Sequence, residues 1–215
     1  MDANEEKRAA ASAAAELVES GMRVGLGTGS TVALLLPELA RRAVAATYVA
    51  TSPRTEEAAR ALGIDVKSFD DVDALDLAID GADQVDADGW LIKGGGAAQT
   101  REKIVAAAAQ RFVVICDSSK LVDQLHAPVP LELQAFGLAA TLRHLGPVTL
   151  RDVPLSPDGG IIADYHGDVG DPEELALWLS SVPGLVAHGL FGPEMVSQVL
   201  VGINGTVRST NGGKQ

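Results

Sequence analysis

Cysteine is almost absent from this chain: Cys116 is the single one among 215 residues. A disulfide needs two cysteines and a CxxC metal site needs a spaced pair, so both are excluded. No apolar run is as long as a membrane span, and the charged residues 1–8 (MDANEEKR) lack the apolar core of a secretory signal. We therefore expect a soluble, cytoplasmic protein without a membrane partner.

Basic residues are scarce as well. The 17 lysines and arginines stand against 29 aspartates and glutamates, which gives a net charge of −12 at pH 7. Such a surface repels phosphate backbones and anionic membranes, so a nucleic-acid partner is disfavoured. An anionic ligand would need a site that is locally positive or rich in free backbone amides.

Strands and helices alternate in the first part of the chain. This alternation predicts a mostly parallel sheet with helices on both faces, an open α/β domain of the Rossmann-like kind. The expected strands are 22–26, 47–50, 64–67, 75–79 and 112–116, and the expected helices are 4–19, 32–44 (broken or restarted at Pro37), 56–62 and 100–109. The domain is predicted to span 1–125 and to regain a strand, 199–203, from 199–215, with 209–215 as a short polar end.

The composition changes near residues 124–130, which predicts a second, smaller domain over 126–198. Strands are expected at 128–134, 148–153, 161–165 and 185–190, and helices at 135–145 and 172–182. The resulting order, βαββαβ, is typical of a ferredoxin-like α+β fold. We expect this domain to act as a lid or in oligomerisation.

Polar clusters follow four of the strands predicted for the first domain. They lie at 27–31, 51–55, 80–83 and 117–120. In open α/β sheets, ligands bind outside the carboxyl ends of the strands. We therefore expect these clusters to form one composite site.

The segment 91–104 (LIKGGGAAQTREKI) predicts a strand end, a glycine loop and the start of a helix. Gly94, Gly95 and Gly96 allow a tight turn and close approach to a ligand, and the amides that open the helix favour an anion. Lys93 and Glu102 add a cation and a carboxylate. The combination suits proton transfer next to a carbonyl. From these residues alone, a loop with a surface ion pair is the alternative.

A second glycine turn, Gly27-Thr28-Gly29-Ser30-Thr31, lies between a strand and a helix. Its hydroxyls and amides can hold a phosphate. No Gly-Lys-Ser/Thr follows, and counting from Gly25 the third glycine of a dinucleotide fingerprint is replaced by Ser30. A small phosphorylated ligand is therefore favoured over a nucleotide, with a plain strand–helix turn as the alternative.

Two carboxylates, Asp80 and Asp83, lie three residues apart in a loop that follows a strand. Two close carboxylates raise one pKa, which suits acid–base chemistry, and they could also bind a divalent metal. A solvated acidic turn is the third interpretation, and it is the one favoured for Asp86 and Asp88.

Together, these segments resemble the A-type ribose-5-phosphate isomerase family over nearly the whole chain. The matching residues are Gly27 to Thr31, Asp80-Gly81-Ala82-Asp83, Lys93 to Ala97 with Thr100 to Lys103, Asp117 to Lys120, Gly189-Leu190-Phe191 and Val201-Gly202. The resemblance implies an aldose–ketose isomerase that interconverts D-ribose 5-phosphate and D-ribulose 5-phosphate, in the non-oxidative pentose phosphate pathway. It also implies a homodimer that needs no metal and no organic cofactor.

The resemblance further implies residue roles. Glu102 matches the base that moves a proton between C2 and C1 through a cis-enediolate, and Asp80 matches an aspartate that assists opening of the furanose ring. Asp83, Lys93 and the amides of Gly94 to Gly96 would bind the sugar oxygens and the developing oxyanion. Further substrate-binding positions are Thr28, Gly29, Ser30, Thr31, Gly81, Ala82, Lys120 and Lys7, the last toward the phosphate.

Two rival functions remain from the sequence. A CoA transferase-like enzyme would attack an acyl-CoA with a glutamate, but the chain lacks the length for a CoA-binding half. A non-catalytic sugar-phosphate sensor would carry a DNA-binding module, and no basic helix–turn–helix segment is spare. The chain departs from the family pattern at Gln84, Gln99 and Gln134-Ala135, where glutamate, an apolar residue and proline are usual.

Overall fold

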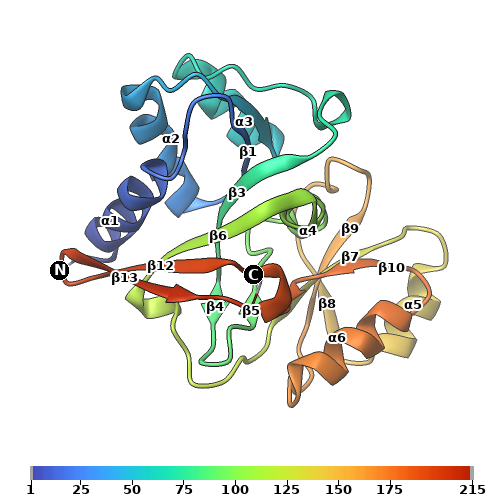
Figure 1. The fold of residues 1–215 in the computed structure, drawn as a ribbon. Helices are drawn as coiled ribbons and strands as arrows, with labels where there is room; N and C mark the ends of the chain where they lie inside the picture. The colour runs from blue at the N-terminus through green and yellow to red at the C-terminus, as the bar shows by residue number, and fades with distance from the viewer. Residues whose placement is uncertain (1, 214–215) are drawn as a thin grey trace.

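Six strands form the central sheet of the computed structural model, which describes residues 2–213 (Figure 1). Their order is β13-β12-β6-β3-β1-β2, and all neighbours are parallel except the β12–β13 pair. The strands are β1 Arg23–Leu26, β2 Thr47–Ala50, β3 Leu75–Gly81, β6 Ala109–Asp117, β12 Gln198–Ile203 and β13 Thr206–Asn211. The carboxyl ends of β1, β3 and β6 therefore meet at one edge of the sheet.

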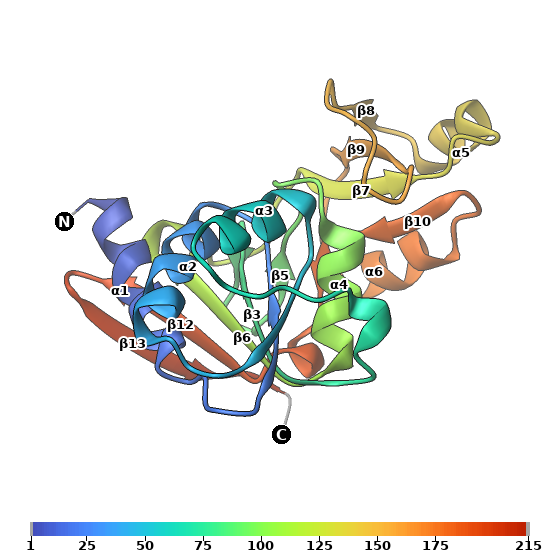
Figure 2. The same cartoon turned by 90° about the horizontal axis from the view of Figure 1, so that it is seen from above.

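Helices cover both faces of this sheet (Figure 2). The helices are α1 Ala3–Ala15, α2 Ser30–Arg42, α3 Pro53–Ala61 and α4 Gln99–Ala108. Side chains alternate along a strand, so Leu77 and Ile79 pack with α1, α2 and α3 while Ala78 packs with α4 on the other face. The predicted layered α/β fold is confirmed.

A second sheet is antiparallel throughout, with the order β10-β7-β9-β8. Its elements are β7 Val129–Leu133, α5 Leu138–Leu145, β8 Val148–Leu150, β9 Ile161–Tyr165, α6 Pro172–Ser181 and β10 Leu185–His188. Numbered by appearance, the strand order is 4-1-3-2, and α5 and α6 share one apolar core with it. This is the predicted ferredoxin-like arrangement.

A small third sheet, β11-β5-β4, joins the two larger ones. It contains β4 Gln84–Val85, β5 Leu91–Ile92 and β11 Leu190–Phe191, and the remaining elements are the short 3₁₀ helices η1 Phe69–Asp71, η2 Ser118–Lys120 and η3 Pro193–Met195. Just after β5, the Lys93 amide donates to the Gly189 carbonyl at 2.8 Å, and the Gly189 amide donates to the Pro130 carbonyl at 2.7 Å. The start of the glycine loop is thus fixed to both parts of the molecule.

Three local predictions differ from the structure. Residues 206–211 form an edge strand that the sequence did not indicate, because their side chains are mostly exposed and lack an alternating apolar pattern. The segment 64–67 makes a single bridge, Tyr48 to Val66, instead of a strand. Helix α2 continues through Pro37, which lies on the exposed face, where water can take over the hydrogen bond that proline removes.

Candidate active site

A cavity of about 90 Å³ lies outside the carboxyl ends of β1, β3 and β6. Its lining consists of Lys7, Thr28, Gly29, Ser30, Thr31, Gly81, Ala82, Asp83, Lys93, Gly94, Gly95, Gly96, Glu102 and Lys120. The structure thus brings together every residue predicted for the site except Asp80, which lies behind the wall. Three polar clusters and the glycine loop form one composite site, as the topology predicts.

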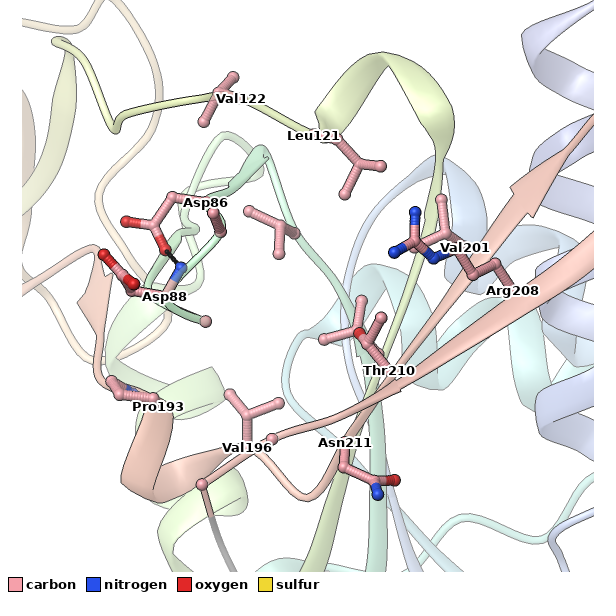
Figure 3. A pocket seen from close by; sticks show the side chains of 16 residues that line it. Asp86, Asp88, Leu121, Val122, Pro193, Val196, Val201, Arg208, Thr210 and Asn211 are labelled. Carbon is pink, nitrogen blue, oxygen red and sulfur yellow. Dashed lines mark hydrogen bonds between the residues drawn. The ribbon is translucent and has the colours of Figure 1, made fainter.

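A larger cavity of about 430 Å³ lies elsewhere, between β4, η3 and the β12–β13 hairpin (Figure 3). Asp86 and Asp88 lie on one side and Arg208 on the other, and valine side chains line the space around them. None of the residues predicted for the site lines it. Convergent charges and free amides, not size, therefore identify the smaller cavity as the candidate active site.

Lys93 forms the centre of a buried charge cluster. Its Nζ lies 2.8 Å from Asp80 Oδ2 and 3.2 Å from Glu102 Oε2, and it donates to the Gly81 carbonyl at 2.5 Å. All three charged side chains are at most 4% exposed. Two carboxylates thus share one cation in a site that excludes most water.

This cluster shifts three pKa values. Burial, together with the charge of Asp80, raises the pKa of Glu102 to about 8, although Lys93 opposes the shift. Burial also raises the pKa of Asp80 against the pull of Lys93. Burial alone would lower the pKa of Lys93, but the charges of Asp80 and Glu102 outweigh it and raise that pKa. Lys93 therefore stays a cation while Glu102 can exchange a proton near neutral pH.

Asp80 is held from three sides. Its carboxylate accepts from the amides of Thr28 at 3.0 Å and Gly81 at 2.7 Å, in addition to Lys93. A Cβ at Gly27 would lie 1.9 Å from the Asp80 carboxyl group, so only glycine fits there. These donors favour the ionised form of Asp80 and so oppose the effect of burial, which still leaves the pKa of Asp80 raised.

The glycine loop presents backbone amides to the cavity. The Gly95 amide donates to Asp83 Oδ2 at 2.7 Å, and Gly94 adopts φ +103°, a conformation that favours glycine. Helix α4 begins directly after the loop and has no side-chain cap at its N-terminus. Glu102 lies in its first turn, so the carboxylate and the free amides face the same small volume.

At another wall of the cavity, two lysines meet the N-terminus of α2. The N-cap residue, Gly29, supplies no side-chain hydrogen bond, so the first amides of this 13-residue helix stay open to a ligand. Lys7 Nζ lies 3.1 Å from Ser30 Oγ, and Lys120 lines the same cavity. This wall is locally positive in an acidic protein and suits a phosphate group.

Some supporting residues were missed in the sequence. The polar cluster at 51–55 does not line the cavity. Instead, Thr28 Oγ1 donates to Ser52 Oγ at 2.8 Å, and Thr55 Oγ1 donates to the Gly27 carbonyl at 2.9 Å. Buried Glu6 accepts from the Ser118 amide and hydroxyl at 3.0 and 2.6 Å, and so fixes the loop before Lys120. Only its position one residue before Lys7 could have indicated Glu6.

Two of the departures from the family pattern, Gln84 and Gln99, lie near the site. Gln84 pairs with the backbone of His126: its Nε2 donates to the carbonyl at 2.8 Å and its Oε1 accepts from the amide at 2.9 Å. A glutamate could not make the first of these bonds when ionised. Gln99 is fully buried against Gly94, and neither of its amide atoms has a hydrogen-bond partner among the described residues.

Over residues 2–213, no group of three His, Cys, Asp or Glu side chains is arranged to hold a metal ion. The metal interpretation of Asp80 and Asp83 finds no support, because Lys93 binds one carboxylate and the Gly95 amide the other. In the same part of the chain, no helix has the length and apolarity that crossing a membrane requires.

Comparison with known proteins places this site in a family. The family model for ribose 5-phosphate isomerase A (phosphoriboisomerase A) matches residues 47–205. The ribose-5-phosphate isomerase A of Methylorubrum extorquens is 47% identical over 211 residues, which is 89% of each chain, and that of Methanosarcina acetivorans is 47% identical over 86% of each. The crystal structure of ribose 5-phosphate isomerase A from Neisseria gonorrhoeae superimposes with a TM-score of 0.93 at 31% identity and covers 98% of both chains. A D-ribose-5-phosphate isomerase in complex with phospho-erythronic acid gives a TM-score of 0.92 at 34% identity, over 98% of this chain and 100% of the other. The chain belongs to the ribose 5-phosphate isomerase A family.

Proposed function

We propose that this protein interconverts D-ribose 5-phosphate and D-ribulose 5-phosphate, with Glu102 as the base. The observation that carries the proposal is the environment of Glu102. Its carboxyl group is buried, lines the cavity, has a pKa raised to about 8 and lies beside Lys93 and the glycine-loop amides. Family membership favours this reaction over the transferase and sensor alternatives.

The cavity orients the substrate by its charge. Lys7, Lys120 and the open N-terminus of α2 would bind the phosphate group. Lys93 and the amides of the glycine loop would then face the opposite end of the sugar, where C1 and C2 react. The substrate is thereby held with its reacting carbons next to Glu102.

Proton transfer follows from that placement. The Glu102 carboxylate removes the proton from C2 of the open-chain aldose, and the electron pair of the C–H bond forms the C1–C2 double bond while the carbonyl electrons move to O1. Lys93 and the loop amides stabilise the resulting enediolate, which is the charge that develops in the transition state. Glu102 returns the proton to C1, and the hydroxyl proton passes from O2 to O1. These groups supply the electrophile, so the proposal needs no metal.

The two aspartates take different parts. The carboxylate of Asp80 lies behind Lys93 and does not line the cavity, so Asp80 acts through Lys93, whose charge and position it maintains. Asp83 does line the cavity and is the better placed of the two to exchange a proton with the ring oxygen. We assign assistance in ring opening to Asp83 on this ground.

The proposal is tested by measuring conversion of ribose 5-phosphate with purified wild type, Glu102→Gln and Glu57→Gln. Glu57 is exposed on α3 and serves as a matched control. We expect conversion by wild type and by the control, and a loss of at least about 10³-fold in Glu102→Gln, since the base is removed. A wild-type protein that does not convert the sugar would overturn the proposal.

Assembly, location and domain limits belong to the same proposal. We infer a homodimer in the cytoplasm, with residues 1–125 and 199–215 as the catalytic domain and 126–198 as a lid or oligomerisation domain. Phe136 lies in the segment 126–198, and its side chain is 95% exposed, which supports a contact surface on that domain. Sedimentation of the purified chain would test the subunit number.

A further inference from the structure

Arg151 reaches from the smaller antiparallel sheet to the glycine loop. It follows β8, and its Nη1 donates to the carbonyls of Gly94 at 2.9 Å and Gly95 at 3.3 Å. Its Nε and Nη2 donate to the two oxygens of Asp164, at 2.7 and 2.6 Å. The Arg151 side chain is only 17% exposed. Asp164 thus fixes the plane of Arg151, and Arg151 in turn holds two loop carbonyls.

The opposite edge of these peptides faces the cavity. In a trans peptide the carbonyl and the amide point in opposite directions. The peptide that joins Gly94 and Gly95 is therefore held on its carbonyl edge by Arg151 and on its amide edge by Asp83, at 2.7 Å. In the next peptide, the carbonyl of Gly95 faces Arg151, so the amide of Gly96, a residue of the cavity wall, points away from it.

Three successive glycines could rotate these peptides at little steric cost. A rotated peptide would direct a carbonyl dipole, instead of an amide, at the enediolate. The Gly94 carbonyl also accepts from the Ala97 amide at 3.0 Å, whereas Arg151 is the one donor to the Gly95 carbonyl within residues 2–213. The pair of Arg101 with Asp158 also connects the smaller domain to helix α4, but it does not contact the loop carbonyls.

We propose that Arg151, oriented by Asp164, is a positioning residue for the isomerase reaction: it holds the Gly95 carbonyl, and so fixes the Gly95–Gly96 peptide with its amide edge toward the reacting oxygens. Its positive charge also polarises these peptides, which strengthens the amides as donors. The inference rests on the proposed function and adds to it a residue that does not touch the substrate and comes from the other sheet.

The variants Arg151→Met and Arg151→Lys test this inference. A lysine cannot bind Asp164 bidentately and reach two carbonyls at once. We expect kcat to fall about 10- to 100-fold in both, with KM changed by less than about threefold, because the amides act mainly in the transition state. Affinity for phospho-erythronic acid, whose carboxylate resembles the paired enediolate oxygens, should fall with kcat. Affinity for inorganic phosphate should not change.

Arg101→Met is the matched control. It removes another bidentate arginine–aspartate pair between α4 and the smaller sheet without touching the loop carbonyls. Because this pair is more exposed than that of Arg151 with Asp164, we expect the variant to lose less thermal stability, and to keep kcat within about threefold of wild type. Asp164→Asn should lower kcat in the same direction as Arg151→Lys, since it releases the guanidinium.

The measurements separate a positioning role of Arg151 from a purely structural one. Wild-type kcat in the Arg151 variants, or an equal loss of phosphate and phospho-erythronic acid binding, would overturn the positioning role while the isomerase function stands. An equal loss of kcat in Arg101→Met would show a merely structural role. An inactive wild-type protein would refute the proposed function, and this inference with it.

Discussion

Replacing Glu102 with glutamine should stabilise the folded protein at alkaline pH. The carboxyl group of Glu102 has a pKa of about 8 in the folded protein, because of burial and the nearby charge of Asp80, against 4.5 as its ordinary value. Between these two pH values, the folded state keeps a proton that the unfolded chain releases. Stability is therefore lost as the pH rises from about 4.5 to 8. Glutamine has no proton to lose, so the variant escapes this loss.

The size of the effect follows from the same two values. Each pKa unit corresponds to about 1.4 kcal/mol, which sets an upper limit near 5 kcal/mol for the full interval. Relaxation of the buried cluster reduces this, and we expect the stability advantage of Glu102→Gln to grow by about 2–3 kcal/mol between pH 5 and pH 9. For a chain of this length, that corresponds to a gain of about 5–10 °C in the Tm difference.

Thermal unfolding of wild type, Glu102→Gln and Glu57→Gln at pH 5, 7 and 9 measures the effect. The exposed control should follow wild type at each pH. A Tm difference for Glu102→Gln that does not depend on pH would refute the reasoning, since it would show that Glu102 titrates alike in the folded and unfolded chains.

Three further predictions concern the same region. The kcat/KM of the wild type should rise about tenfold per pH unit up to about pH 8 and then level off, because Glu102 must be ionised to act as a base; a flat profile from pH 6 to 9 would contradict this. Gly27→Ala should lower kcat more than about tenfold and destabilise the fold by about 1–3 kcal/mol, because the new Cβ would lie 1.9 Å from the Asp80 carboxyl group. Activity assays measure the first effect and urea unfolding the second. Wild-type values in both would contradict the packing argument. Gln84→Glu should lower the free energy of unfolding by about 1–3 kcal/mol at pH 8, because a carboxylate oxygen would face the His126 carbonyl. Urea unfolding should show a smaller loss as the pH falls toward 5. An equal loss at both pH values would refute the explanation.

Most of the cavity lining could be predicted because its signals are local, whereas Lys7 was indicated only by the resemblance to the isomerase family. Glycines, hydroxyls and charges follow the strands directly at 27–31, 80–83 and 93–96, and the topology of an open parallel sheet brings strand ends together. Each cluster carries its own chemistry, so no knowledge of distant contacts was needed. The same reasoning placed 51–55 at this edge, where it supports Thr28 from behind.

The different roles that we propose for Asp80 and Asp83 could not be derived from the residues alone, and the family resemblance implied that Asp80 assists ring opening. Both are aspartates in one short loop, and the sequence does not show which one faces the cavity. The structure shows which one does: Asp80 is 3% exposed and pairs with Lys93, whereas Asp83 lines the cavity. The raised pKa of Glu102, which lies in α4, could not be predicted either, since it depends on burial and on the charge of Asp80 in β3.

Contacts to backbone atoms leave no trace in a sequence pattern. Arg151 binds carbonyls 56 and 57 residues away, and a carbonyl is present at every residue, so no residue type marks the partner. Strand β13 was missed for a similar reason: it pairs with β12 through its backbone, while its exposed side chains carry no apolar period. Tertiary pairing, not local preference, determines both.

The central claim is that Glu102 moves a carbon-bound proton. It is tested most directly by converting ribose 5-phosphate in deuterated water, with a chelator present, and locating deuterium in the ketose. We expect the wild type to produce ribulose 5-phosphate with deuterium at C1 and Glu102→Gln to be nearly inactive. Undiminished turnover by Glu102→Gln, with the same deuterium at C1, would contradict the account, because another group would then be the base.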